Sequence, residues 1–211
     1  MVGKAVLLEC LADHRITHIL LINRTPLAVS HPKVKELLVP NFSNLSAVAL
    51  PQKYDACFHC MGVSVAGLSE KEYDMVTYEF TQNLINFVSH QKLDMVFNHI
   101  SGEGTDSTEK GKVMWARVKG KTENIIFSFG FKDAYAFRAG MILPEKGIKS
   151  KTRLYRLAYR LTWLFFPLLR KMNNITTTTL FGQAMINSLF YPQNQKILHN
   201  PDINTLANLN S

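Results

Sequence analysis

The sequence predicts an α/β protein with a Rossmann-type doubly wound parallel sheet. Short apolar runs alternate with stretches of helical periodicity, and most runs end at turn residues or glycine. Strands that alternate with crossover helices form a parallel sheet covered by helices on both faces. The chain has 211 residues, of which 46% are hydrophobic and 19% charged, so it is long and apolar enough to fold around a core.

Each element rests on its own pattern. Ser69 and Glu72 have capping-box spacing and start a helix, which apolar residues at helical spacing continue from 73 to 87. After Gly140 a leucine stripe over 154–168 predicts a helix that Pro167 ends or kinks, followed by a β-branched run over 176–179 and a final helix over 180–190. The other expected elements are helices over 4–13 and 113–127 and strands over 16–22, 34–39, 55–60, 95–100 and 134–137.

Charge is concentrated in one segment. The net charge is +8, and residues 146–171 hold eight basic residues and no acidic one, which leaves 16 basic and 16 acidic residues elsewhere. A local basic segment does not support nucleic-acid binding by the whole domain. The favoured interpretation is a substrate-region helix with its leucine face in the core. Peripheral contact of residues 149–171 with an anionic membrane is the weaker alternative.

The cysteines indicate a reduced protein without a metal site. Cys57 and Cys60 form a C-x-x-C, but no second pair completes a zinc site, and Cys10 makes the number odd. We therefore interpret all three as reduced core thiols and expect a cytoplasmic protein.

Spacing near the start of the chain suggests a dinucleotide site. The third glycine of a dinucleotide fingerprint lies in the first turn of the first helix, and the residue that reads the ribose follows about 20 positions later. Counting from Gly3 leads to Asn23 and Arg24, where no carboxylate is available for the 2′-hydroxyl of NAD. Arg24 suits a 2′-phosphate, which favours NADP(H) over NAD(H). The alternative is a solvated loop arginine.

Two further strand ends carry candidate cofactor contacts. Met61 and Gly62 follow an apolar strand, and a glycine there lets the backbone approach a ligand closely. Asn41 follows the preceding strand and could contact an adenine. The alternative for each position is an ordinary turn.

A possible catalytic group follows in the sequence. Ser101 ends a strand, and Trp115 and Lys119 lie four residues apart on the next helix, so they share a face. A lysine there can bond ribose hydroxyls and lower the pKa of a nearby acid. The alternative for Lys119 is a solvated helix lysine.

Six short stretches of the sequence, from VGKAVLLECL near the start to FRAGMILP near residue 140, together resemble the short-chain dehydrogenase/reductase superfamily in their order and spacing. The resemblance extends to about Asn200 and is strongest to its atypical branch, which includes Tat-interacting reductase-like and NAD-dependent epimerase/dehydratase-like proteins. It implies an NAD(P)(H)-binding domain over 1–141 and a substrate region over 142–211. The stretches are VGKAVLLECL, LLINRTP, CFHCMG, HISGEG, MWARVKGKTEN and FRAGMILP. The family pattern implies Gly3, Arg24 and Gly62 at the cofactor, Ser101 and Lys119 in the active site, and Arg138 near the nicotinamide.

Two departures from the family pattern limit what can be inferred. Trp115 stands where the family's Tyr-x-x-x-Lys has its tyrosine, and an indole donates a hydrogen bond but has no useful acid–base pKa. The chain is therefore either a reductase- or epimerase-like protein acting on an unknown small molecule, or a non-catalytic cofactor-binding regulatory or protein-interaction module. In addition, the family's first strand and first two glycines precede the position of Gly3. We expect them to be missing, which leaves the neighbouring strands with unpaired backbone groups.

Overall fold

A computed structural model describes residues 1–45, 48–90, 94–148, 172 and 174–209. It confirms the α/β class and the parallel sheet. The elements in chain order are α1 (Val2–Ala12), β1 (Ile19–Asn23), β2 (Val34–Leu38), β3 (Ala56–His59), α2 (Glu70–Asp74), the π-helical turn η1 (Met75–Glu79), α3 (Phe80–Ser89), β4 (Val96–Gly102), α4 (Met114–Ser128), β5 (Asp133–Ala139), β6 (Met141–Leu143), β7 (Ile175–Thr177), α7 (Thr178–Asn187), β8 (Ile197–His199) and α8 (Asn200–Ala207).

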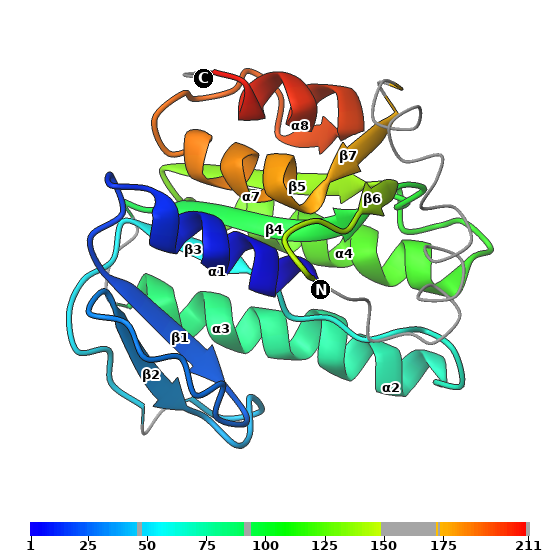
Figure 1. Cartoon of the computed structure of the whole chain (residues 1–211). Coiled ribbons are helices and arrows are strands. Elements are labelled where there is room, and N and C mark those ends of the chain that lie inside the picture. The colour runs from blue at the N-terminus through cyan, green and yellow to red at the C-terminus, as the bar shows by residue number, and fades with distance from the viewer. Residues whose placement is uncertain (46–47, 91–93, 149–171, 173, 210–211) are drawn as a thin grey trace.

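The main sheet has four parallel strands in the order β3-β4-β5-β8. One apolar cluster packs α3 and α4 against one face, with Phe97, Ile85 and Ile126 fully buried in it. A second cluster packs α1, α7 and α8 against the other face around Phe137 and Phe181. Figure 1 shows β4 and β5 between these two helical layers. Both faces of the central strands are therefore buried, as in doubly wound sheets.

The sheet is interrupted between β3 and β1. Strands β1 and β2 form a separate parallel pair, and no ladder joins that pair to β3 within the described residues. Side chains hold the pair in place instead: Ile19 packs against the α1 side of the core and Ile22 against the α3 side. In Figure 1 the β1–β2 pair lies apart from the main sheet, at the lower left. A third short pair, β6–β7, is also parallel.

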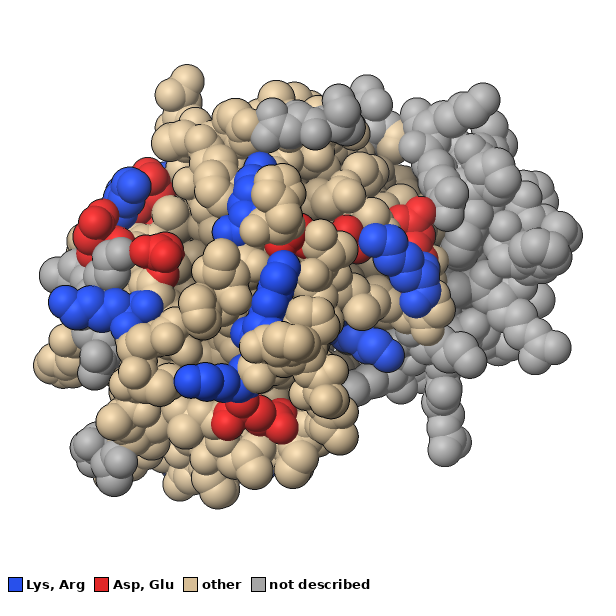
Figure 2. Space-filling view, turned by 60° about the vertical axis from the view of Figure 1, so that its left-hand side comes forward, with Lys and Arg blue, Asp and Glu red and all other residues tan. Residues whose placement is uncertain are grey.

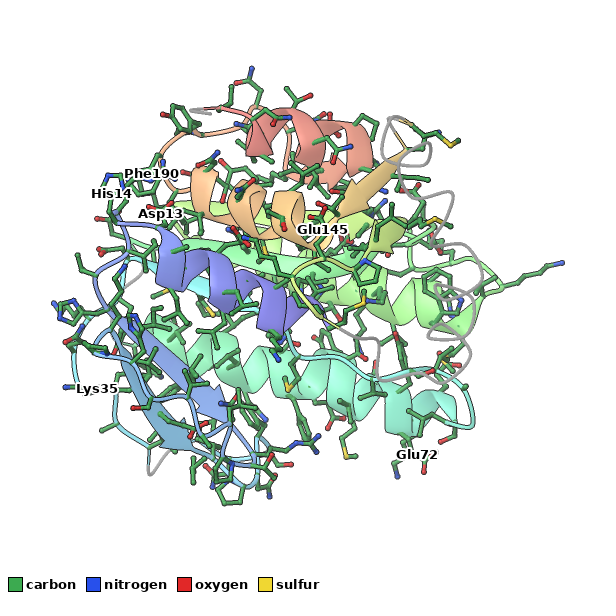
Figure 3. All side chains as sticks on the ribbon, viewed as in Figure 1. Asp13, His14, Lys35, Glu72, Glu145 and Phe190 are labelled. Atoms are coloured by element: carbon green, nitrogen blue, oxygen red, sulfur yellow. The ribbon has the colours of Figure 1, made fainter. Side chains whose placement is uncertain are left out.

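Helix α1 is fixed by close packing against its neighbours. A methyl group added to Gly182 of α7 would lie 2.6 Å from Cγ of Glu9, so the two helices approach closely only because Gly182 has no side chain. The buried Glu9 carboxylate pairs with Lys146 at 2.5 Å. At the other end of the helix, Arg15 bonds Asp13 and stacks over Phe190, 4.5 Å from the ring centre. Figure 3 shows Asp13 beside Phe190 at the end of α1.

The capping box at Ser69 and Glu72 is confirmed. The Ser69 hydroxyl accepts from the Glu72 amide, and the Glu72 carboxylate accepts from the Ser69 amide at 2.8 Å. Glu72, labelled in Figure 3, lies in the first turn of α2. The helix continues through one π-helical turn into α3, and such turns are frequent at functional sites.

Some expectations fall outside the described residues, and some elements were not expected. The helix over 154–168 and the basic segment over 149–171 are not described. Strand β8 and helix α8 were not predicted, although Pro201 in the first turn and Asp202 in a capping box with His199 form a helix start. Charges of both signs are interleaved on the face shown in Figure 2. Among the described helices, none is both long enough and apolar enough to cross a bilayer.

All three cysteines are free thiols. Burial raises the pKa of Cys10, of Cys57 and of Cys60 to about 12, so all three are held as neutral thiols. Within the described residues, no group of three or more His, Cys, Asp or Glu side chains could hold a metal ion.

Candidate functional site

Apart from Gly3 on α1 and Trp115 and Lys119 on α4, the predicted site residues lie at or just beyond the carboxyl ends of the parallel strands. Arg24 follows β1, Asn41 lies beyond β2 and Gly62 lies beyond β3. Ser101 and Arg138 lie within their strands, near the carboxyl ends of β4 and β5. The ends of β3, β4 and β5 meet at one edge of the main sheet, which is where ligands bind in open α/β folds.

Ser101 is buried, and its hydroxyl is already engaged. Its Oγ lies 3.0 Å from Oγ1 of Thr105, and the Thr105 hydroxyl donates to the carbonyl oxygen of Gly102 at 2.7 Å. A hydroxyl has one proton to donate. Because Thr105 gives its proton to Gly102, Ser101 is the donor in the bond between the two hydroxyls. Ser101 would have to rotate to donate to a substrate.

Lys119 and Trp115 of α4 lie over the turn that follows β4. A Cβ atom added to Gly102 would lie 3.9 Å from Cε of Lys119. A Cβ atom added to Gly104 would lie 3.4 Å from the edge of the Trp115 ring. The structure therefore brings Lys119 and Trp115 to the carboxyl end of β4, the strand that carries Ser101, as the shared helix face predicts. Burial lowers the pKa of Lys119, and the nearby charge of Glu123 opposes that shift.

Arg138 is held in a buried ion pair. Its guanidinium bonds the carboxylate of Glu123 through Nε at 3.0 Å and Nη2 at 2.5 Å, and also donates to the hydroxyl of Ser107. Glu123 is fully buried and Arg138 is 9% exposed. The guanidinium therefore anchors β5 to α4 and to the loop after β4. Sequence reasoning placed Arg138 at the nicotinamide and did not identify Glu123 as its partner.

Two buried histidines lie beneath this site and were not predicted. His59 of β3 and His99 of β4 are register partners, with their Nδ1 atoms 2.8 Å apart and their rings stacked at 5.0 Å. Burial lowers the pKa of His59 to about 4 and that of His99 well below its ordinary value, and the charge of Lys119 adds to both shifts. Both rings are therefore neutral at physiological pH. Polar histidines inside two apolar strand runs are the signal that could have identified the pair.

The glycines near the cofactor edge differ in their surroundings. A methyl group on Gly3 would lie 3.1 Å from Cβ of Cys60, so Gly3 lets the start of α1 pack against the end of β3. A methyl group on Gly62 would meet no atom of the described residues within 4 Å. Packing within the chain therefore explains Gly3 but does not explain Gly62. Met61 is partly buried against the α3 side of the core.

The loops after β1 and β2 are fixed by polar side chains. Arg24 is exposed, and its loop is held by Glu36 of β2, whose carboxylate accepts from Asn23 Nδ2 and from the Leu27 amide, both at 2.9 Å. Asn41 is exposed, and its side-chain oxygen accepts from the Ser43 amide at 2.8 Å in a local turn. Glu36 was not identified from the sequence, since it acts across two strands.

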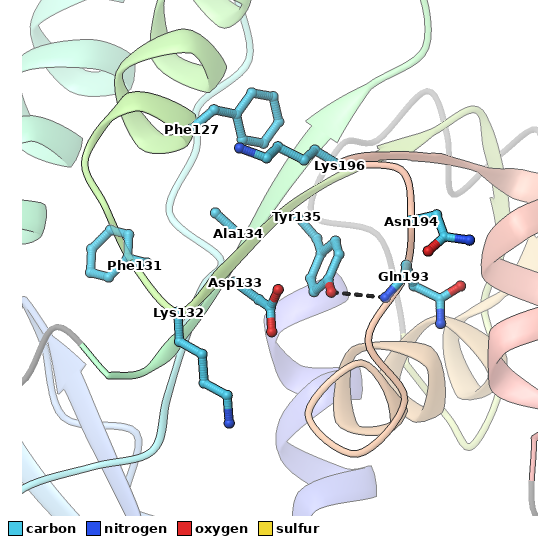
Figure 4. A pocket seen from close by; sticks show the side chains of 9 residues that line it. All are labelled: Phe127, Phe131, Lys132, Asp133, Ala134, Tyr135, Gln193, Asn194 and Lys196. Atoms are coloured by element: carbon cyan, nitrogen blue, oxygen red, sulfur yellow. Dashed lines mark hydrogen bonds between the residues drawn. The ribbon is translucent and has the colours of Figure 1, made fainter.

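A pocket lies at the opposite end of β5. Residues at the start of that strand and from the segment before β8 line it, and Figure 4 shows the Tyr135 hydroxyl accepting from the Gln193 amide at 2.9 Å. Because this pocket is at the amino end of β5, it is distinct from the edge that carries Ser101 and Lys119.

No protein-family model and no curated protein matches the sequence. Solved structures do match. A monomeric L-threonine 3-dehydrogenase from a metagenome database, in the apo form, has 11% identity and a TM-score of 0.69 over 97% of this chain and 77% of that chain. RMD from Pseudomonas aeruginosa complexed with NADPH has 14% identity and a TM-score of 0.59 over 94% and 73%. The Bordetella bronchiseptica enzyme WbmH in complex with NAD+ has 10% identity and a TM-score of 0.60 over 90% and 68%. The chain therefore has the Rossmann-type fold that its resemblance implied.

Proposed function

We propose that this chain binds a nicotinamide dinucleotide and belongs to a reductase- or epimerase-like protein of the atypical short-chain dehydrogenase type. The observation that carries the proposal is the arrangement of Lys119 and Trp115 at the end of β4, the strand that contains Ser101. Gly3 places the start of α1 against the end of β3, which suits a pyrophosphate near that helix start. Two structures with this fold carry NADPH or NAD+.

Arg24 supports NADP(H) over NAD(H) within this proposal. It is exposed just after β1, where it can reach a 2′-phosphate, and no acidic residue adjoins it in sequence. Glu36 of β2 lies beside this loop but is engaged with Asn23 and Leu27. Calorimetric titration with NADPH and with NADH tests the preference. We expect Arg24→Ala to weaken NADPH binding by about tenfold or more and to leave NADH binding unchanged. Equal losses for both cofactors would contradict the assignment.

Trp115 favours a second candidate, a cofactor-binding module without catalysis. Its indole cannot exchange a proton as a phenol can, and the Ser101 hydroxyl is bonded to Thr105. Trp115→Tyr separates the two candidates. Turnover that appears only in this variant supports the non-catalytic module, whereas wild-type turnover abolished by Lys119→Ala supports an enzyme. In either case we propose a cytoplasmic protein whose residues 142–211 supply the region that meets substrate or partner.

The interruption between β1 and β3 suggests that a dinucleotide-binding form contains another strand. Each of these strands is paired on one side only, by β2 and by β4, within the described residues. A parallel strand between them, leading into a glycine loop ahead of Gly3, would pair both edges and complete the pyrophosphate cradle. We therefore propose that dinucleotide binding requires a strand and a glycine loop at this gap. Cofactor titration of this chain alone and of the chain fused, ahead of Gly3, to a designed strand and glycine loop tests this. A longer protein that gives no thermal shift and no heat with NADPH or NADH would refute the proposed function.

A further inference from the structure

A buried hydrogen-bond chain runs beneath the proposed active site. Thr81 of α3 donates its hydroxyl proton to the carbonyl oxygen of Thr77 at 2.6 Å. Nε2 of His59 lies 3.4 Å from the same Thr81 hydroxyl oxygen, and Nδ1 of His59 lies 2.8 Å from Nδ1 of His99. Thr81, His59 and His99 are all buried, with exposed fractions of 0%, 3% and 1%. These hydrogen bonds therefore connect a helix to two neighbouring strands without contact with bulk water.

The direction of each bond follows from the number of protons available. Thr81 has one hydroxyl proton and gives it to Thr77, so it accepts from Nε2–H of His59. A neutral imidazole with its proton on Nε2 has a lone pair on Nδ1. His99 must then donate from Nδ1 to His59. His99 is also neutral, and its Nε2 is left with a bare lone pair.

No hydrogen-bond donor among the described residues reaches this lone pair. Nε2 of His99 is buried and has no hydrogen-bond partner among the described residues. Buried polar atoms in folded proteins are almost always paired. The fixed tautomer means that the missing partner must be a donor, and an apolar or anionic group would not satisfy it.

The polar groups around His99 narrow the choice of donor. On β4, the Ser101 proton goes to Thr105, and on β3, His59 has no second proton to give. On α4, the Glu123 carboxylate is paired with Arg138 of β5 and is an acceptor. Of the other α4 cations, Arg117 is paired with Glu70 and Lys121 with Asp74. Lys119 is the α4 cation whose charge acts on both imidazoles.

We propose that Nε2 of His99 accepts a hydrogen bond from a buried water that the Lys119 ammonium in turn donates to. His99 is then a positioning residue for Lys119, and His59 and Thr81 fix its tautomer. An ammonium has three protons, so one can go to the water that bridges to His99 and two remain for ribose hydroxyls. A neutral acceptor orients the lysine without cancelling its charge. This inference rests on the proposed function for the role of Lys119 but not for the hydrogen bond itself.

NMR of the uniformly ¹⁵N-labelled, cofactor-free protein tests the bond. We expect His59 to carry its proton on Nε2 and His99 on Nδ1, with both rings neutral from about pH 5 to 8 and a coupling across the Nδ1–H···Nδ1 bond. Protonated Nε2 on His99 at neutral pH would overturn the proposal. This measurement needs no variant and no cofactor, so a failure to bind NADPH would leave its outcome unaffected.

The pKa of Lys119, followed by NMR titration, separates positioning from mere packing. His99→Leu keeps the volume but removes the acceptor, and we expect the Lys119 pKa to fall by roughly half a unit to one unit. Thr81→Val removes the group that fixes the tautomer and should lower the same pKa by a smaller amount. The charged groups nearby, Glu123 and Arg138, are unchanged in both variants. A Lys119 pKa that is the same in wild type and in either folded variant would overturn the proposal.

Discussion

The carbonyl oxygen of Asp106 lies directly against the Cα of Gly120, so that a methyl group added to Gly120 would lie 1.8 Å from that oxygen. The Asp106 amide also donates to the carbonyl of Ala116 at 3.1 Å. The loop after β4 is therefore packed onto α4 by backbone contact. That contact sets the distance between Ser101 on the strand and Lys119 on the helix, because the loop and the helix cannot separate without breaking it.

We expect Gly120→Ala to destabilise the protein by at least about 1–3 kcal/mol, the usual cost of overpacking a rigid site. The added methyl group meets backbone atoms, which cannot rotate away as a flexible side chain can. Urea unfolding followed by circular dichroism measures the change. Gly62→Ala is the matched control, since its methyl group meets no atom within 4 Å in the part of the chain that the structure describes. A cost for Gly120→Ala no larger than the control's would show that the loop and α4 are not in close contact.

Gly62 gives a prediction about ligand contact. Because no described residue occupies the space beside its Cα, Gly62→Ala should change the free energy of unfolding by less than about 0.5 kcal/mol. If the cofactor approaches the backbone here, the same variant should weaken NADPH binding by about tenfold. Thermal unfolding and calorimetric titration of one preparation give both values. Unchanged NADPH affinity in a protein that binds NADPH would remove Gly62 from the cofactor site.

The Glu123–Arg138 pair predicts an asymmetry between single and double variants. Removing one partner leaves the other charge buried and unpaired, so Glu123→Leu or Arg138→Met alone should cost about 3–5 kcal/mol. The double variant removes both charges and should be more stable than either single one. Denaturant unfolding of all four proteins completes the cycle. Additive losses in the double variant would mean that the two side chains do not depend on each other.

Local patterns predicted much of the fold and the outline of the site. Helix α1, the capping box and strands β3 and β4 follow from periodicity and turn residues that lie within a few positions of each other. The four-residue spacing of Trp115 and Lys119 likewise placed both side chains on one face of α4. These features depend on short-range geometry, which a single sequence contains.

Features that depend on strand register or on distant segments were not predictable in this way. The His59–His99 pair exists because β3 and β4 align in one particular register, and Arg138 meets Glu123 because β5 packs on α4. Strand β8 has only three residues, too few for a periodic pattern, and is recognisable only by its pairing with β5. The engagement of Ser101 with Thr105 needs the conformation of the turn after β4.

The capping box predicts a pH-dependent contribution to stability. Hydrogen bonds from the Ser69 hydroxyl and the Ser69 amide lower the pKa of the Glu72 carboxyl below its ordinary value of 4.5. A carboxyl whose pKa is lower in the folded state stabilises the protein above its unfolded pKa, and this stabilisation is lost as pH falls through the folded value. Glu72→Gln should therefore lower the free energy of unfolding at pH 7 and have progressively less effect as pH falls below 4.5.

Urea unfolding of wild type and Glu72→Gln at about pH 7, 4.5 and 3 tests this pH dependence. Glu79→Gln, which removes an exposed carboxylate on η1, controls for the general loss of a negative charge. Ser69→Ala should cost about 0.5–2 kcal/mol at pH 7, because it removes the cap of the helix amides as well as the partner of Glu72. A Glu72→Gln effect that stays constant from neutral to acidic pH would show that the capping box is not maintained in solution. The same result would mean that α2 starts without its reciprocal cap. Helix α2 continues into the π-helical turn that contains Thr77, whose carbonyl oxygen accepts from Thr81 in the buried hydrogen-bond chain.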